Sequence, residues 1–158
     1  MTGQAYTTSG AAMTQLVLQI FRVNGLLLTV GDDLTRGLGL TSARWQVLGA
    51  LADGPLTAAQ IARNMGLKRQ SVQRLVDVLT EQGILLFEDN PHHRRAKLVR
   101  LSEAGQRKYE QISKIQARWV NSVSRDVDVQ EIDAVVTLLR NLEVRLQKPT
   151  AFVDPSPK

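Results

Sequence analysis

Apolar residues recur every three or four positions along most of the chain, which is the spacing of amphipathic helices. The first such stretch covers about residues 11–36 and carries two offset stripes. One stripe consists of Leu16, Ile20, Val23, Leu27, Val30 and Leu34, and the other of Val17, Phe21 and Leu28. Because a helix that is apolar on two sides needs cover on both, we expect the chain's own core on one side and a second subunit on the other.

Two local features of this first helix carry expectations of their own. Gly25 lies in its middle, where glycine costs stability, and we expect it to permit a close approach or a bend. Asp32 and Asp33 lie near its end and are expected to form a solvated turn.

Capping residues place three further helices. Thr41 is a good N-cap for a helix from Ser42 to about Ala52, which turns Trp45, Leu48 and Leu51 inward. Ser102 caps a long helix that reaches about Ser124. Asp128 and Glu131 predict a capping box at the start of the last helix, whose apolar stripe consists of Ile132, Val135, Val136, Leu139, Leu142 and Leu146.

Between these helices lies a pair of shorter ones. Thr57 and Gln60 predict a capping box, so that a helix starts at Ala58. Gly66 ends this helix, and a second begins within about three residues, which is the connection of a helix-turn-helix. The second helix has a buried face made of Val72, Leu75, Val76 and Leu79.

The opposite face of this second helix is polar and basic. It carries Arg69, Gln70, Ser71, Gln73 and Arg74. Such side chains donate to phosphates and also reach base edges, where arginine suits guanine and glutamine suits adenine. A plain solvated helix face is the alternative. The helix before it and the segment after it favour a helix that lies in a DNA groove.

After Gly83 the pattern changes to short apolar runs. Residues 84–88 and 97–101 predict two strands, and the segment between them is turn-forming and basic. A two-stranded ribbon with a basic tip directly after a DNA-reading helix is a wing.

Gly83 is followed by a strand, by Pro91 and then by the segment Arg94-Arg95-Ala96-Lys97-Leu98-Val99-Arg100-Leu101-Ser102-Glu103-Ala104-Gly105. This arrangement resembles the wing and following helix start of the MarR family of winged-helix transcription regulators. The resemblance covers most of the chain, from the first helix to the last. It implies a mainly α fold with a small β-ribbon. The expected organisation is one domain at 11–148 between two tails, at 1–10 and 149–158. Within the domain we expect dimerisation helices at 11–36 and 103–147 and a winged helix-turn-helix lobe at 41–101.

The resemblance also implies a function: a homodimeric regulator, expected to be a repressor, that binds a palindromic operator in double-stranded DNA. The expected DNA contacts are Lys68, Arg69, Gln70, Ser71, Gln73, Arg74, His93, Arg94, Arg95 and Lys97. Two positions depart from the family pattern. Lys68 stands where the cap before the DNA-reading helix is usually Ser, Thr or Asp, and His93 stands at the acidic position two residues before the wing arginine, Arg95. Either a protonated His93 strengthens DNA binding at lower pH, or the histidines contribute nothing.

MarR-like proteins often accept small aromatic or phenolic ligands in a crevice between the dimerisation helices and the DNA-binding lobe. The residues that the resemblance suggests for such a crevice are Arg22, Val23, Leu26 and Trp45. Arg22 would anchor a carboxylate. A ligand of this kind is expected to release the DNA.

Composition narrows the classes of protein to which the chain can belong. At 158 residues the length fits one domain, and 43% hydrophobic residues favour a globular protein. The net charge of +5 favours a polyanionic partner, with a membrane surface as the rival. There is no cysteine, so no disulfide framework forms.

No catalytic signature and no complete set of metal ligands accompanies the His92-His93 pair, so we expect no enzyme, cofactor or metal. The apolar stretch from Leu16 to Val30 is interrupted by polar residues, which argues against a transmembrane span, and no basic n-region precedes it, which argues against a signal peptide. We therefore expect a cytoplasmic protein. Two rival functions remain. One is a winged-helix protein-interaction module without specific DNA binding, and the weaker is an enzyme that modifies small molecules.

Overall fold

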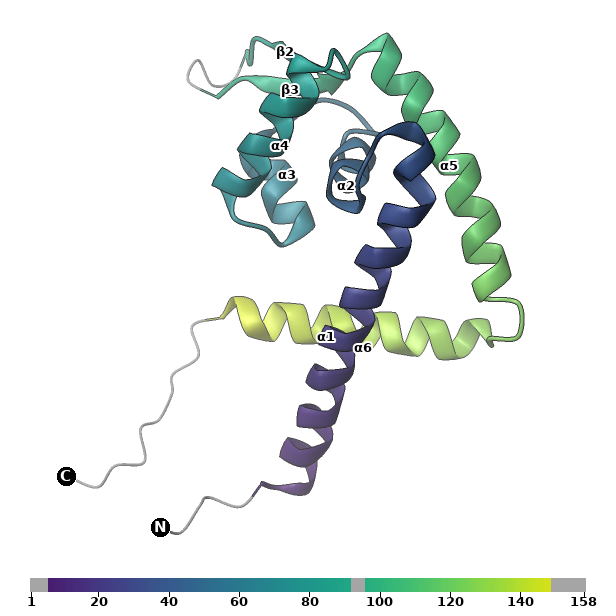
Figure 1. The fold of residues 1–158 in the computed structure, drawn as a ribbon. Helices are drawn as coiled ribbons and strands as arrows, with labels where there is room; N and C mark the ends of the chain where they lie inside the picture. The colour runs from purple at the N-terminus through teal and green to yellow at the C-terminus, as the bar shows by residue number, and fades with distance from the viewer. Residues whose placement is uncertain (1–5, 92–95, 149–158) are drawn as a thin grey trace, which may run out of the picture. The chain divides into compact units, whose positions relative to one another are not determined.

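The computed structural model describes residues 6–91 and 96–148, and it confirms a mainly α fold with a small β-sheet (Figure 1). The chain folds as two compact units, Met1–Ala117 and Arg118–Lys158. Within the described residues the elements are, in order, α1 Thr8–Thr35, the 3₁₀ turn η1 Arg36–Leu38, α2 Ser42–Ala50, β1 Leu56–Thr57, α3 Ala58–Met65, α4 Arg69–Glu81, β2 Leu85–Glu88, β3 Leu98–Leu101, α5 Glu103–Val123 and α6 Val129–Gln147.

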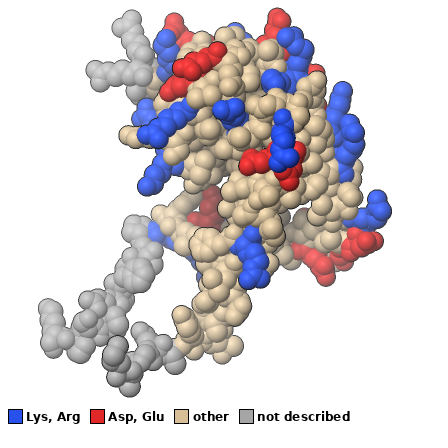
Figure 2. Space-filling view, viewed as in Figure 1, with Lys and Arg blue, Asp and Glu red and all other residues tan. Residues whose placement is uncertain are grey.

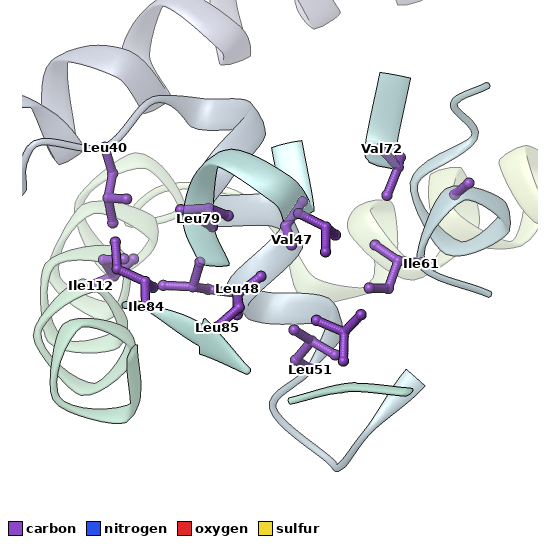
Figure 3. Packing of buried hydrophobic residues seen from close by; sticks show 13 residues of the cluster. Leu40, Val47, Leu48, Leu51, Ile61, Val72, Leu79, Ile84, Leu85 and Ile112 are labelled. Carbon is purple, nitrogen blue, oxygen red and sulfur yellow. The ribbon is translucent and has the colours of Figure 1, made fainter. Parts of the chain in front are cut away.

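The core of the first unit lies where α2, α3, α4, the sheet and the first part of α5 meet. Leu48, Leu79 and Leu85 are fully buried and point toward one another, next to Ile84 and Ile112 (Figure 3). Burying each such side chain contributes about 1.5–3 kcal/mol. The prediction that Leu48 and Leu51 face inward is confirmed, and Trp45 is half-buried against the same core.

The sheet has one strand more than the sequence predicts. Its order is β1-β3-β2, with both pairs antiparallel. Leu56 pairs with Val99 and Thr57 with Leu98, so the residues directly before α3 form one of the two edge strands. A strand of two residues is too short to show an alternating pattern. It matters because it ties the start of α3 to the wing.

The first helix starts earlier than expected. α1 begins at Thr8 rather than Ala11, because the Thr7 side chain accepts a hydrogen bond from the Gly10 N–H at 3.0 Å. Residues 8–10 of the predicted tail are therefore helical. At its C-terminal end α1 continues into the 3₁₀ turn η1, which ends at Gly39 with a φ of +69°.

Asp32 and Asp33 are exposed as predicted, but the predicted turn is wrong, since both residues are helical. The Asp32 carboxylate accepts a hydrogen bond from the Ser42 N–H at 2.6 Å, which joins α1 to the start of α2. Asp33 forms an ion pair with Arg36. The close approach lies at Gly31, where an added Cβ would be 2.6 Å from the Ser42 hydroxyl. At Gly25, an added Cβ would meet nothing within 4 Å.

The last helix is capped as predicted, but without the capping box. The Asp128 side chain accepts a hydrogen bond from the Gln130 N–H at 2.9 Å. The Glu131 N–H instead donates to the Asp128 backbone oxygen at 3.1 Å, so Asp128 alone supplies the side-chain cap.

By length and composition alone the helical segment Thr8–Leu38 is long and apolar enough to cross a membrane, since an 18-residue window within it has a mean hydropathy of 1.3. The sequence argues against a span, and the structure adds a second argument. Thr35 is 1% exposed, and its hydroxyl donates to the Gly31 and Leu40 backbone oxygens at 2.8 and 3.1 Å. These contacts hold the end of α1 to the segment that leads into α2. The exposed apolar residues of α1 therefore belong to a helix anchored in a folded lobe.

Candidate nucleic-acid interface

The helix-turn-helix forms through the local signals in its sequence. Thr57 Oγ1 accepts from the Gln60 N–H at 3.3 Å, and Gln60 Oε1 accepts from the Thr57 N–H at 2.8 Å, so the predicted capping box is confirmed. Gly66 ends α3 with a φ of +63°, a left-handed conformation that glycine adopts without strain. α4 then begins at Arg69, and the Lys68 side chain makes no capping bond.

The two faces of α4 divide as the sequence predicts. Val72, Val76 and Leu79 are 0% exposed and fill the core. On the outside, Lys68, Arg69, Gln70, Ser71 and Arg74 are exposed, and Gln73 is half-buried. Helix α4 thus presents a row of hydrogen-bond donors on a rigid support.

A hollow of about 350 Å³ lies between the start of α3, the start of α4 and the base of the wing. We call it the α3 hollow, and its lining residues are Thr57, Ala58, Ala59, Arg69, Gln73, Ala96 and Lys97. The first N–H groups of a helix have no partner in their own helix, and they carry partial positive charge. Together with Arg69 and Lys97 they make the hollow suited to an anion such as a phosphate.

Figure 2 shows Lys and Arg side chains projecting from the edge of the lobe formed by α3 and α4. Of the residues expected to contact DNA, Arg69, Gln73 and Lys97 line the α3 hollow. Ala58 and Ala59 are additions to the predicted set. Their contribution is backbone at a helix start, which the capping box at Thr57 could have indicated.

The base of the wing is held by specific contacts. Ser102 Oγ donates to the Gly83 backbone oxygen at 2.6 Å and accepts from the Gly105 N–H at 3.0 Å, so it joins the start of β2 to the start of α5. On the outer face of the ribbon, Arg100 forms an ion pair with Glu88 at 3.1 Å. Lys97 is exposed at the start of β3. The wing residues His93, Arg94 and Arg95 lie outside the described residues.

The residues expected to line a ligand crevice lie on two helices of the first unit. Arg22, Val23 and Leu26 are exposed on α1, with Leu26 61% exposed. Trp45 is half-buried on α2 and packs against the core. Their role as ligand contacts stays a prediction.

Each unit also carries a helix with exposed apolar side chains. On α1 these are Met13, Leu18, Phe21, Val23, Leu26, Leu27 and Leu28. On α6 they are Val129, Ile132, Val135, Val136, Leu138, Leu139, Val144 and Leu146. So many exposed large apolar side chains on one helix mark an interaction surface on each of the two helices.

A helix-turn-helix followed directly by a paired ribbon defines the chain as a winged-helix DNA-binding protein. The sequence profile of the MarR family matches residues 38–96, which include the helix-turn-helix and the first wing strand, β2. Over 135 residues the chain is 34% identical to an uncharacterised protein of Mycobacterium tuberculosis, a match that covers 85% of this chain and 94% of the relative. The chain belongs to the MarR family of transcriptional regulators.

Solved structures of the same family share the fold. A mutant of MarR from E. coli, complexed with operator DNA, has a TM-score of 0.72 at 20% identity, covering 83% of this chain and 95% of that one. CouR from Rhodococcus jostii RHA1, bound to p-coumaroyl-CoA, has a TM-score of 0.69 at 23% identity, covering 85% and 93%. Identities this low show a common fold, and the bound molecules are those of the two relatives.

Proposed function

We propose that this protein is a homodimeric repressor that binds a palindromic operator and releases it when a small ligand binds. The observation that carries the proposal is the donor-rich outer face of α4, which stands beside the anion-suited α3 hollow. One feature suits base edges and the other suits the DNA backbone, and a duplex offers both side by side.

The proposed contacts divide by chemistry. Gln70, Gln73 and Arg74 read base edges in the major groove. Phosphates are held by Arg69, Ser71, Lys97 and the first N–H groups of α3, while Lys68 adds charge. The wing residues His93, Arg94 and Arg95 are assigned to the adjacent minor groove from the sequence alone.

Dimerisation is proposed from the exposed apolar residues of α1 and α6. Covering surfaces of this kind in an obligate pair usually buries more than about 2,000 Å². A two-fold dimer presents two copies of α4, which fit half-sites about 34–36 Å apart, and this spacing is the reason for proposing a palindrome.

The ligand is proposed to be a small aromatic or phenolic compound, held near Trp45, Val23 and Leu26 with Arg22 binding its carboxylate. CouR, which shares this fold, was crystallised with p-coumaroyl-CoA, and this supports a phenolic class. Titrating a panel of phenolic acids into the protein–DNA complex tests this part. Loss of bound DNA with one of them supports the proposal, and a panel that leaves the complex intact opposes it.

The proposal is tested by selecting duplexes from a randomised DNA pool. We expect enrichment of an inverted repeat whose affinity falls steeply as salt rises, because bound Lys and Arg displace counterions. A cytoplasmic location follows from such a partner. The alternative, a winged-helix module that binds another protein, predicts no enriched sequence and no salt-dependent DNA affinity.

Replacing Arg74 by alanine is expected to cost about 1–3 kcal/mol on the selected duplex and to relax the preference at one base pair. Arg74 is exposed on α4, so its removal should leave the fold intact. Competition binding with single-base variants of the duplex measures the effect. An unchanged base preference would mean that α4 does not read the groove as proposed.

Replacing Lys97 by alanine is expected to weaken binding to every duplex to a similar extent and to lower the slope of log affinity against log salt by about one unit. The reason is that Lys97 lines the α3 hollow, where it would neutralise a phosphate. Lys114→Ala is the matched control, since Lys114 is an exposed lysine on α5. Equal salt slopes for the two variants would remove Lys97 from the interface.

A further inference from the structure

Helix α4 contains a side-chain pair that the assignment of DNA contacts does not use. Gln73 Nε2 donates a hydrogen bond to Asp77 Oδ1 at 2.8 Å. Residues four apart lie on the same face of a helix, so the contact needs no distortion. Gln73 is half-buried at the edge of the α3 hollow, whereas Asp77 is exposed one turn further along.

The chemistry of this pair determines how the glutamine amide is turned. An ionised carboxylate only accepts hydrogen bonds, so it holds the amide by the nitrogen end. The opposite orientation would bring Gln73 Oε1 against Asp77 Oδ1 and lose a charge-assisted bond. Oε1 therefore stays free to accept from a partner, while Asp77 takes one of the two N–H bonds of Nε2.

A glutamine amide with a fixed orientation distinguishes between bases that a freely rotating glutamine amide binds equally well. In the major groove, adenine and cytosine each present an amino group that donates, and adenine presents the N7 acceptor beside it. Guanine and thymine present no amino group there, only acceptors at O6 and N7 or at O4. A free glutamine serves either kind by rotating its amide. With one N–H held by Asp77, the amide offers Oε1 together with its second N–H, and this edge suits a base that presents an amino group. Against guanine or thymine Oε1 would face another acceptor, and turning it away costs the Gln73–Asp77 bond.

We propose that Asp77 is a positioning residue that turns Oε1 of Gln73 toward the major groove, so that this position favours adenine or cytosine over guanine and thymine. The inference rests on the proposed DNA-binding function and adds a specificity to one residue of it. The plain alternative is that the pair merely stabilises α4, a role that predicts lower stability and an unchanged base preference.

The test uses the duplex selected by the full-length wild-type protein. Gln73→Ala first identifies the base pair that Gln73 reads, as the pair at which discrimination is lost. All four bases are then placed there, and wild type is expected to favour adenine or cytosine on the contacted strand. Asp77→Asn keeps the shape but offers either an oxygen or an N–H₂ group, so the amide of Gln73 is free to turn. We expect discrimination at that pair to fall about three- to tenfold, the loss of roughly one hydrogen bond.

Glu81→Gln is the matched control. Glu81 is exposed on α4, one further turn along, and its replacement removes the same charge without touching Gln73. Both substitutions are expected to raise affinity for all duplexes similarly, since each removes repulsion from phosphates. Only Asp77→Asn should alter the preference at the pair read by Gln73, and thermal unfolding should show both variants folded.

The inference is overturned if Asp77→Asn discriminates among the four bases as wild type does, or if Gln73→Ala leaves every preference unchanged. It is also overturned if wild type prefers guanine or thymine at the pair read by Gln73. Failure of the proposed function looks different, because the wild-type protein then enriches no sequence at all.

Discussion

Substitution of Leu139 by aspartate is expected to abolish the dimer and to leave aggregated or unfolded protein. Leu139 belongs to the apolar stripe of α6 and is 38% exposed in the single chain. If this stripe is buried between subunits, the carboxylate loses its water without gaining a partner. An uncompensated buried charge costs about 3–5 kcal/mol, and a two-fold interface contains it twice. Leu16→Asp on α1 should act in the same way.

Sedimentation velocity at micromolar concentration measures this outcome. Asn141→Asp is the matched control, because residue 141 lies on the opposite side of α6 from residue 139 and is exposed. The control should sediment as the wild-type dimer. A wild-type protein that sediments as a stable monomer would contradict the proposed dimer, and so would a dimeric Leu139→Asp variant.

Replacement of Gly105 by alanine is expected to destabilise the lobe by about 1–3 kcal/mol, the range for overpacking a tight site. An added Cβ would lie 2.1 Å from the Ile84 backbone oxygen and 3.2 Å from its carbonyl carbon. This oxygen also accepts from the Ser102 N–H at 3.0 Å. The obstacle is backbone, so relief requires α5 to move away from the start of the wing.

Urea unfolding at a fixed protein concentration compares Gly105→Ala with Gly49→Ala. At Gly49, in α2, an added Cβ meets nothing within 4 Å, so alanine should stabilise by about 0.4–1 kcal/mol through the unfolded state. The two variants thus carry the same chemical change with opposite expected signs. Equal stability of the Gly105→Ala variant and wild type would show that the contact between α5 and Ile84 is not tight in solution.

Local signals were sufficient where a structure depends on near neighbours. The Thr57–Gln60 capping box, the Gly66 stop and the buried face of α4 are all contained within a few turns of helix, and each was predicted correctly. The two wing strands are also local, since a hairpin pairs segments that are close in sequence. Local rules failed in detail at Asp128, where the cap exists but the reciprocal bond does not.

The order of residues alone was enough to predict the class of fold, the helix-turn-helix, the wing and the set of polar residues on the outside of α4. Which of these residues act together depended on the folded chain. Folding brings Lys97 to the start of α3 through the pairing of β1 with β3. It also places the Asp32 carboxylate beside the Ser42 N–H and Gly31 beside the Ser42 side chain. The physical reason is that periodicity and capping report on neighbours along a helix, whereas strand pairing and close backbone approach depend on segments far apart in sequence.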